Sequence, residues 1–249
     1  MSFIRSSGFW TSVIAFIALV LSQFPPVTKL FPSWGAEIEI AARMALDNKF
    51  GIVSYSVYFN IKNVGNRPIK VEEVVLSVKR PDGSRKEYEA KDYRERESSS
   101  VIYPIVSLNI EEGDQWSENV LFGPDTPPDT QEKFNDLRMK IGLDILEERQ
   151  RNSDMACQKR WYEAKEENVD KAVEFFKENF DLPKGEYIAS FKVYGRDNAL
   201  IAEKSYRFTI YDYHIKMFKS QVDDYKYGIG VHSPASTARS VVVDLIPNE

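Results

Sequence analysis

The 249-residue chain contains little cysteine and little histidine: Cys157 is its single cysteine, and His214 and His232 are its two histidines. One cysteine excludes an intramolecular disulfide and any cysteine-based zinc site. The two histidines lack the H-E-x-x-H spacing of a helical zinc site. We therefore expect no metal and no cofactor, and we interpret both histidines as structural or surface residues and Cys157 as a passive thiol.

Sequence motifs of catalytic and phosphate-binding sites are also missing. No G-x-S-x-G nucleophile elbow occurs. Gly228 and Gly230 form a close glycine pair, but the further glycine or Lys-Ser/Thr of a phosphate loop does not follow. Asp125 and Asp129 lack the spacing of a calcium loop, so a solvated turn is the better interpretation. Lys and Arg number 33 against 38 Asp and Glu, and this net charge of −5 argues against a nucleic-acid partner.

Charge is absent from residues 8–24, and nine apolar residues run without interruption from Val13 to Leu21. With Ser6 and Ser7 included, the uncharged stretch has 19 residues and reaches roughly 28 Å as a helix, close to the hydrocarbon thickness of about 30 Å, and Pro25 and Pro26 end it. The pattern predicts a transmembrane anchor within residues 1–26. Its apolar members are Phe9, Trp10, Val13, Ile14, Phe16, Ile17, Leu19, Val20 and Leu21.

Two alternatives to an anchor remain open, a cleaved signal peptide and a buried core helix. A signal peptide is less favoured because Arg5 is the only basic side chain before the span and no small-x-small cleavage site follows. The short leading segment favours an N-terminus inside the cell. We therefore expect a single-pass membrane protein with a linker at residues 27–35 and an extracytoplasmic domain at residues 36–249.

Alternating apolar residues predict a β-rich body. The clearest strand runs from Val53 to Ile61, where every second residue is apolar, and a turn at residues 63–68 ends it. Residues 137–145 also alternate, although Phe134, Leu137, Ile141 and Ile145 match helical spacing; the strand is the favoured interpretation. Further strands are expected at residues 69–79, 85–90, 101–108, 115–122, 187–193, 206–210, 213–218 and 240–245.

One segment breaks the β pattern. Residues 147–180 are highly charged, and Val169, Ala172, Val173, Phe176 and Phe180 repeat at helical spacing. We expect an α-helical insertion between strands here, because strand patterns resume directly after it.

Two stretches resemble a known architecture. LPKGEYIASFKVYGRDNALIAEKSYRFTI resembles the final hairpin of bacterial immunoglobulin-like or fibronectin-type β-sandwiches, and VSYSVYFNIKNVGNRPIKVEEVVLSVKRPDG resembles an early strand pair of the same folds. The Cys-Trp-Cys pattern of true immunoglobulin domains is absent. The resemblance implies a mainly β, immunoglobulin-like antiparallel sandwich with a binding or scaffolding role.

Four aromatic residues are candidates for an interaction surface. Tyr58 and Tyr194 are out of phase with the apolar residues of their strands, so they lie on the outer face or under a covering helix or loop. Trp161 and Tyr162 lie in the expected helical insertion.

The sequence leads to a membrane-anchored, non-catalytic binding or scaffolding protein as the favoured hypothesis. Its expected partners are the lipid bilayer, through the first helix, and a protein or a ligand such as a glycan. A carboxylate-dependent, glycosidase-like hydrolase is one alternative, since the chain is rich in acidic residues. A cytoplasmic, membrane-tethered sensor or effector subunit is the other.

Overall fold

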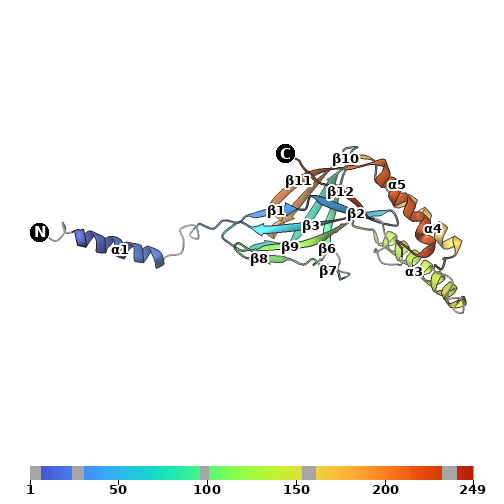
Figure 1. Cartoon of the computed structure of the whole chain (residues 1–249), viewed down its shortest axis with the longest axis horizontal. Coiled ribbons are helices and arrows are strands. Elements are labelled where there is room, and N and C mark those ends of the chain that lie inside the picture. The colour runs from blue at the N-terminus through green and yellow to red at the C-terminus, as the bar shows by residue number, and fades with distance from the viewer. Residues whose placement is uncertain (1–6, 24–30, 96–100, 153–160, 232–239, 249) are drawn as a thin grey trace.

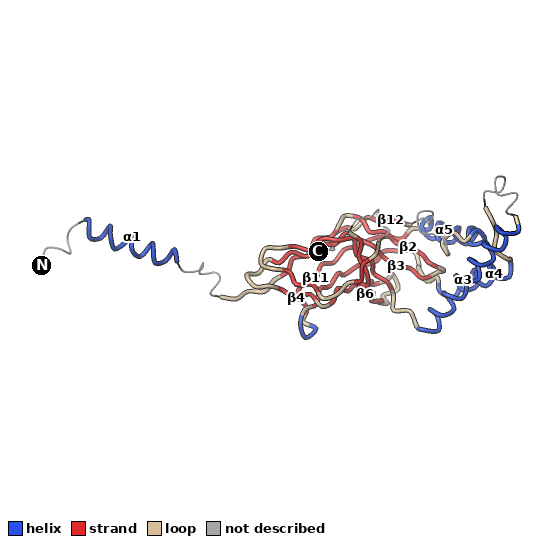
Figure 2. Tube along the Cα trace, turned by 90° about the horizontal axis from the view of Figure 1, so that it is seen from below, coloured by secondary structure: helices blue, strands red, loops and turns tan. Residues whose placement is uncertain are grey.

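The protein folds around one large antiparallel β-sheet that curves until it is nearly closed, with α3 (Pro128–Arg151), α4 (Glu166–Asn179) and α5 (Asp212–Ser220) gathered at one of its ends and α1 (Ser7–Gln23) beyond the opposite end (Figures 1 and 2). The computed structural model describes residues 7–23, 31–95, 101–152, 161–231 and 240–248. Eleven described strands form the sheet: β1 (Ala36–Ile40), β2 (Arg43–Lys49), β3 (Ile52–Asn63), β5 (Glu73–Lys79), β6 (Arg85–Arg94), β7 (Tyr103–Pro104), β9 (Gln115–Gly123), β10 (Gly185–Tyr194), β11 (Leu200–Ile210), β12 (Val241–Asp244) and β13 (Ile246–Pro247).

The strand order is β12-β2-β3-β9-β6-β5-β10-β11-β13, with β1 also beside β3 and β7 beside β6. Two short strands, β4 (Ile69–Val71) and β8 (Leu108–Ile110), pair separately. The Lys204 ammonium of β11 donates to the Ile38 carbonyl of β1 at 3.2 Å, which links two strands that share no ladder. The expected antiparallel, mainly β fold is confirmed, and its main sheet is one continuous layer.

The core of the sheet follows the alternation seen in the sequence. In β3, Tyr55, Val57, Phe59 and Ile61 are buried, as predicted for the strand at Val53–Ile61. The β5–β6 and β10–β11 hairpins also form as expected. The expected early strand pair is wrong, because β3 and β5 are separated in the sheet by β9 and β6.

The helical end consists of α3 (Pro128–Arg151), α4 (Glu166–Asn179), α5 (Asp212–Ser220) and the 3₁₀ helix η4 (Gln221–Tyr227). The helical insertion is confirmed, but it begins earlier than residue 147. The strands predicted at residues 137–145 and 213–218 are wrong, since these residues belong to α3 and α5. Pro127 and Pro128 favour the start of α3, because the fixed φ of proline suits the first helical turn and its missing N–H has no helical partner there.

The β2–β3 turn joins the sheet to the helical end. Phe50 adopts a φ of +50° and is fully buried, outside the sheet core and inside the core of the helices. At the next position, Gly51 has a φ of +91°, and a Cβ there would lie 2.5 Å from a backbone oxygen of α4, so glycine is required. Three rings pack edge-on against Phe50, at centroid distances of 5.3, 6.0 and 5.1 Å: Phe134, Phe175 and Tyr225.

The predicted transmembrane anchor and membrane localisation are wrong. The first helix, α1 (Ser7–Gln23), has 17 residues. Among the described residues, no helix combines the length and the apolar character that crossing a membrane requires. Four of the apolar side chains of α1 are exposed: Trp10, Ile14, Phe16 and Leu19.

Candidate functional site at the helical end

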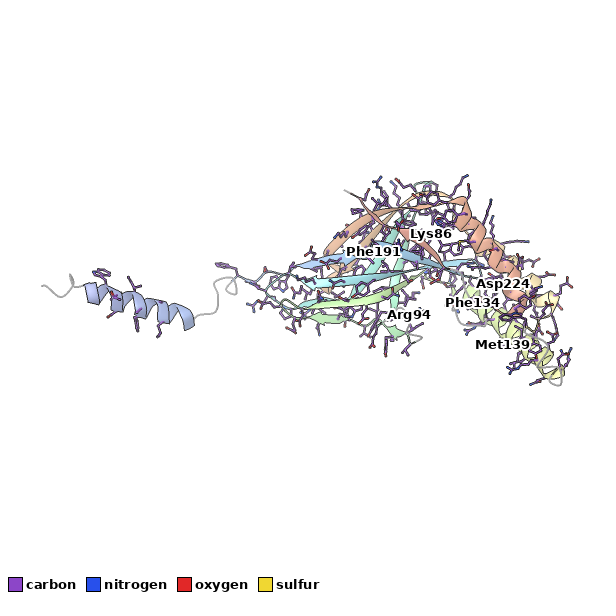
Figure 3. All side chains as sticks on the ribbon, viewed as in Figure 1. Lys86, Arg94, Phe134, Met139, Phe191 and Asp224 are labelled. Carbon is purple, nitrogen blue, oxygen red and sulfur yellow. The ribbon has the colours of Figure 1, made fainter. Side chains whose placement is uncertain are left out.

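Helix α3 carries two apolar faces, and only one of them is packed. Leu137 and Ile141 are buried in the helical core, and Phe134 and Ile145 pack against it. On the opposite side Met139, Leu143 and Leu146 are exposed, with 57%, 51% and 47% of their surface accessible. We call these three residues the α3 stripe; Met139 is labelled in Figure 3.

The α3 stripe has the spacing of a helix–helix contact. Its members are four and three residues apart, so they form one row along the helix. Single exposed apolar residues are common on protein surfaces, but a row of three on one helix face marks an interaction surface more often. The α3 stripe therefore forms a ridge of side chains against which a second helix can pack.

Charges beside the α3 stripe differ between its two sides. On one side, Lys140 pairs with Asp136 at 2.6 Å and Arg151 pairs with Glu147 at 3.3 Å. On the other side lie Arg138 and Arg149, which are eleven residues or about three turns apart, exposed, and without an ion pair to any described residue. This flank is therefore a basic border of the stripe.

Asp144 fixes the position of α4 against α3. Its carboxylate is 5% exposed and accepts hydrogen bonds from the Lys165 backbone N–H at 3.1 Å and from the Asn168 amide at 2.6 Å. It also pairs with the Lys165 ammonium at 2.9 Å. Burial alone would raise the pKa of Asp144, but these hydrogen bonds outweigh it and hold the pKa below its ordinary value. Asp144 thus ties Lys165 and Asn168, at the start of α4, to α3.

A cavity of about 280 Å³ lies where the sheet meets the helical end. The β2–β3 turn, the β5–β6 hairpin, the β9–α3 connection and the residues after α4 all contribute to its wall. Its polar lining includes Arg80, Lys86, Tyr88, Thr126, Thr130 and Asp181. Lys86 is labelled in Figure 3.

Two cations in this wall share one carboxylate. The buried Arg80 guanidinium donates to Asp181 twice, to Oδ2 at 2.6 Å and to the backbone oxygen at 2.7 Å. The Lys86 ammonium lies 3.0 Å from the same Oδ2. The hydrogen bond from Arg80 is the main reason that the pKa of Asp181 lies below its ordinary value. Three charges with a sum of +1 therefore face one another at the cavity.

The four aromatic candidates from the sequence do not form one surface. Tyr58 is 52% exposed on the outer face of β3, and Tyr194 is partly buried at the end of β10, separated from β3 by β9, β6 and β5. Trp161 and Tyr162 precede α4, outside any helix, and the Trp161 ring lies 6.0 Å from the Tyr227 ring of η4. Whether any of the four binds a partner stays a prediction.

Of the two histidines and the cysteine, only His214 lies among the described residues. His214 is buried in α5, and burial lowers its pKa. Cys157 and His232 lie outside the described residues. Within the described ranges, no three residues among histidine, cysteine, aspartate and glutamate are grouped closely enough to hold a metal ion.

Glu118 and Glu95 are a pair of acids at one edge of the β6–β9 ladder. Glu118 of β9 is partly buried, and Glu95 directly follows Arg94, the last residue of β6, which pairs with Asn119. Burial, followed by the charge of Glu95, raises the pKa of Glu118. Neither residue lines the cavity at the helical end.

The chain was compared with known proteins, and neither a protein-family model nor a curated protein matches it. The α3 stripe was missed in the sequence because residues 137–145 were interpreted as a strand. The helical spacing of the apolar residues is nevertheless visible in the sequence. One row on the helix consists of Phe134, Leu137, Ile141 and Ile145, and a second row consists of Met139, Leu143 and Leu146.

Proposed function

We propose that this protein is a non-catalytic binding protein whose helical end docks an amphipathic helix of a partner protein. The α3 stripe is the observation that carries the proposal. Its three exposed apolar side chains have the spacing that a partner helix matches with apolar residues at positions i, i+3 or i+4, and i+7.

The charge beside the stripe specifies the partner further. Arg138 and Arg149 lie along one border of α3 without ion pairs to the described residues. A partner helix with acidic residues along one edge of its apolar face complements that border, and such complementarity adds specificity and speeds association. The proposed partner is therefore an acidic amphipathic helix.

The resemblance of residues 182–210 to immunoglobulin-like and fibronectin-type hairpins agrees with a binding role, because domains of these folds often serve as binding modules. The hydrolase alternative has less support. A general acid needs a raised pKa, whereas the pKa of Asp181, the acid that pairs with Arg80 in the cavity wall, is lowered. Glu118 has a raised pKa but lies away from that cavity.

Site-specific crosslinking tests this proposal. A photo-crosslinking amino acid is placed at Met139 in the full chain and, as a control, at the exposed Glu174 of α4. We expect the Met139 position to capture a partner segment that mass spectrometry identifies as an amphipathic helix with an acidic edge. A crosslink to a second copy of this chain, or the same products from both positions, would contradict the proposal.

Paired substitutions separate binding from folding. Leu143→Glu changes an exposed side chain, so stability should change by no more than about 0.5 kcal/mol, while affinity for the identified helix falls at least roughly tenfold. Ile141→Glu places a charge in the helical core and should unfold the helical end. Arg149→Glu should weaken binding and reduce its salt dependence. Unchanged affinity of Leu143→Glu would refute docking on the stripe.

A further inference from the structure

We propose that the cavity between the sheet and the helical end binds a small anion, a carboxylate or phosphate group, with Lys86 as its charged contact. This site is separate from the α3 stripe and does not depend on the docking of a partner helix.

The charge of the wall favours an anion over a cation. Arg80 and Lys86 bring two positive charges to the single carboxylate of Asp181, at 2.6 and 3.0 Å. Arg80 is 8% exposed at its side chain and is held by two hydrogen bonds, so its charge is fixed in the wall. The residual charge of +1 is not neutralised by the other acid of the lining, because Asp125 has a 97% exposed side chain and pairs with Lys91.

The remaining donors of the wall match an oxyanion. Lys86 is about half exposed and uses one of its three N–H groups on Asp181, which leaves donors for a ligand. Thr126 and Thr130 are half-buried and line the same cavity, and each hydroxyl can donate one hydrogen bond. A carboxylate or phosphate accepts several such bonds at once, and bonds between charged groups are the strong ones.

The size of the cavity limits the ligand. Its volume of about 280 Å³ is small. Small-molecule pockets generally enclose about 300–1,000 Å³, so this cavity lies just below the lower limit of the range. Ile52, Val53 and Pro124 supply an apolar part of the wall. The site therefore suits a small organic acid or phosphate ester in which the anionic group carries a short apolar or neutral body.

Titration with inorganic phosphate and with glycolate, at constant ionic strength, tests the site in the full chain. Backbone amide signals of Thr126 and Thr130 report binding by NMR. We expect saturable shifts with at least one of these two probes, and the probe that binds more tightly distinguishes a phosphate site from a carboxylate site. The absence of saturable shifts with both probes would overturn the proposal.

Lysine variants show whether the binding is specific. Lys86→Gln should weaken binding roughly tenfold or more, because it removes a charge-assisted hydrogen bond, and Lys86→Arg should retain most of it. Lys70→Gln is the matched control, since Lys70 is also paired with one carboxylate, at 2.7 Å, but lies on β4 outside the cavity lining. Equal effects of Lys86→Gln and Lys70→Gln would mean a general charge effect and would refute the site. If Lys86→Gln does not fold, Thr130→Val, which keeps the shape and removes a donor, provides the same test.

Discussion

Folding changes the pKa of two acids of the helical end and of two acids of the sheet in opposite directions. Asp144 and Asp181 accept hydrogen bonds from amide, ammonium or guanidinium groups, and both have a lowered pKa. For Asp47 on β2 and Glu118 on β9, burial is the largest influence, and both have a raised pKa. The ionised form is therefore favoured by folding at Asp144 and Asp181 and disfavoured by folding at Asp47 and Glu118.

This difference shows how the two regions are held together. The sheet has a large apolar core, so it remains folded although two of its acids are poorly compensated. The helical end has a smaller core around Phe50, and charged groups at defined distances fix its helices and its junction with the sheet. Removing the carboxylate of Asp144 or Asp181 should therefore destabilise the protein, whereas removing the carboxylate of Glu118 should stabilise it.

Removing the Asp144 carboxylate should have the largest effect. Asp144→Ala leaves the backbone N–H of Lys165 and the amide of Asn168 without their acceptor at a partly buried position. The loss should cost about 2–3 kcal/mol. Asp136→Ala is the control, because it removes an acid of the same helix that is more exposed and pairs with Lys140. A pair of this kind should contribute less than about 0.5 kcal/mol.

Urea unfolding at pH 7 measures the free energy of unfolding of both variants. Equal losses in Asp144→Ala and Asp136→Ala would show that Asp144 does not fix the start of α4 against α3.

An intermediate effect is expected for Asp181→Asn. The variant keeps an acceptor for Arg80 but removes its counter-charge. The change should cost about 1–2 kcal/mol at neutral pH. The folded pKa of Asp181 is lowered. The stabilisation of the folded protein by ionised Asp181 is therefore complete above the pKa of the unfolded state, about 3.9. It is lost as pH falls through the lower pKa of the folded state.

Thermal unfolding as a function of pH tests whether the ionised carboxylate of Asp181 is the source of this stabilisation. Wild type and Asp181→Asn should differ in stability at neutral pH and converge below about pH 4. If wild type and Asp181→Asn still differ in stability in acid, the ionised carboxylate is not the source of the stabilisation.

The sequence predicts the sheet better than the helical end because the two regions bury their residues differently. β3 buries one side, so its period of two is visible in Tyr55, Val57, Phe59 and Ile61. In α3, the core row and the exposed stripe together place an apolar residue at every second position from residue 137 to residue 145, which imitates a strand. The false prediction thus came from the exposed residues that now form the candidate docking site.

The cavity could not be predicted for another reason. Arg80, Asp181 and Thr130 are far apart in the sequence and meet only because the β5–β6 hairpin, the end of α4 and the start of α3 converge on the β2–β3 turn. No local pattern records such a convergence. The α1 prediction is contradicted because no helix among the described residues is both long enough and apolar enough to cross a membrane.

The smallest effect is expected on the sheet, and its sign should be reversed. Glu118→Gln removes an ionised group that burial and Glu95 disfavour. The variant should therefore be more stable than wild type at neutral pH, by less than about 1 kcal/mol because Glu118 is partly exposed. The folded pKa of Glu118 is raised. The destabilisation by ionised Glu118 is complete above the pKa of the folded state. It disappears as pH falls to the pKa of the unfolded state, about 4.3.

The advantage of Glu118→Gln should therefore fade on mild acidification, at a higher pH than the loss of the Asp181 contribution. Glu89→Gln on β6 is the control for removing one negative charge from an exposed sheet position, and urea unfolding across this pH range compares the two variants. If Glu118→Gln and Glu89→Gln have the same stability and the same pH profile, the contrast between the acids of the sheet and those of the helical end does not hold for Glu118.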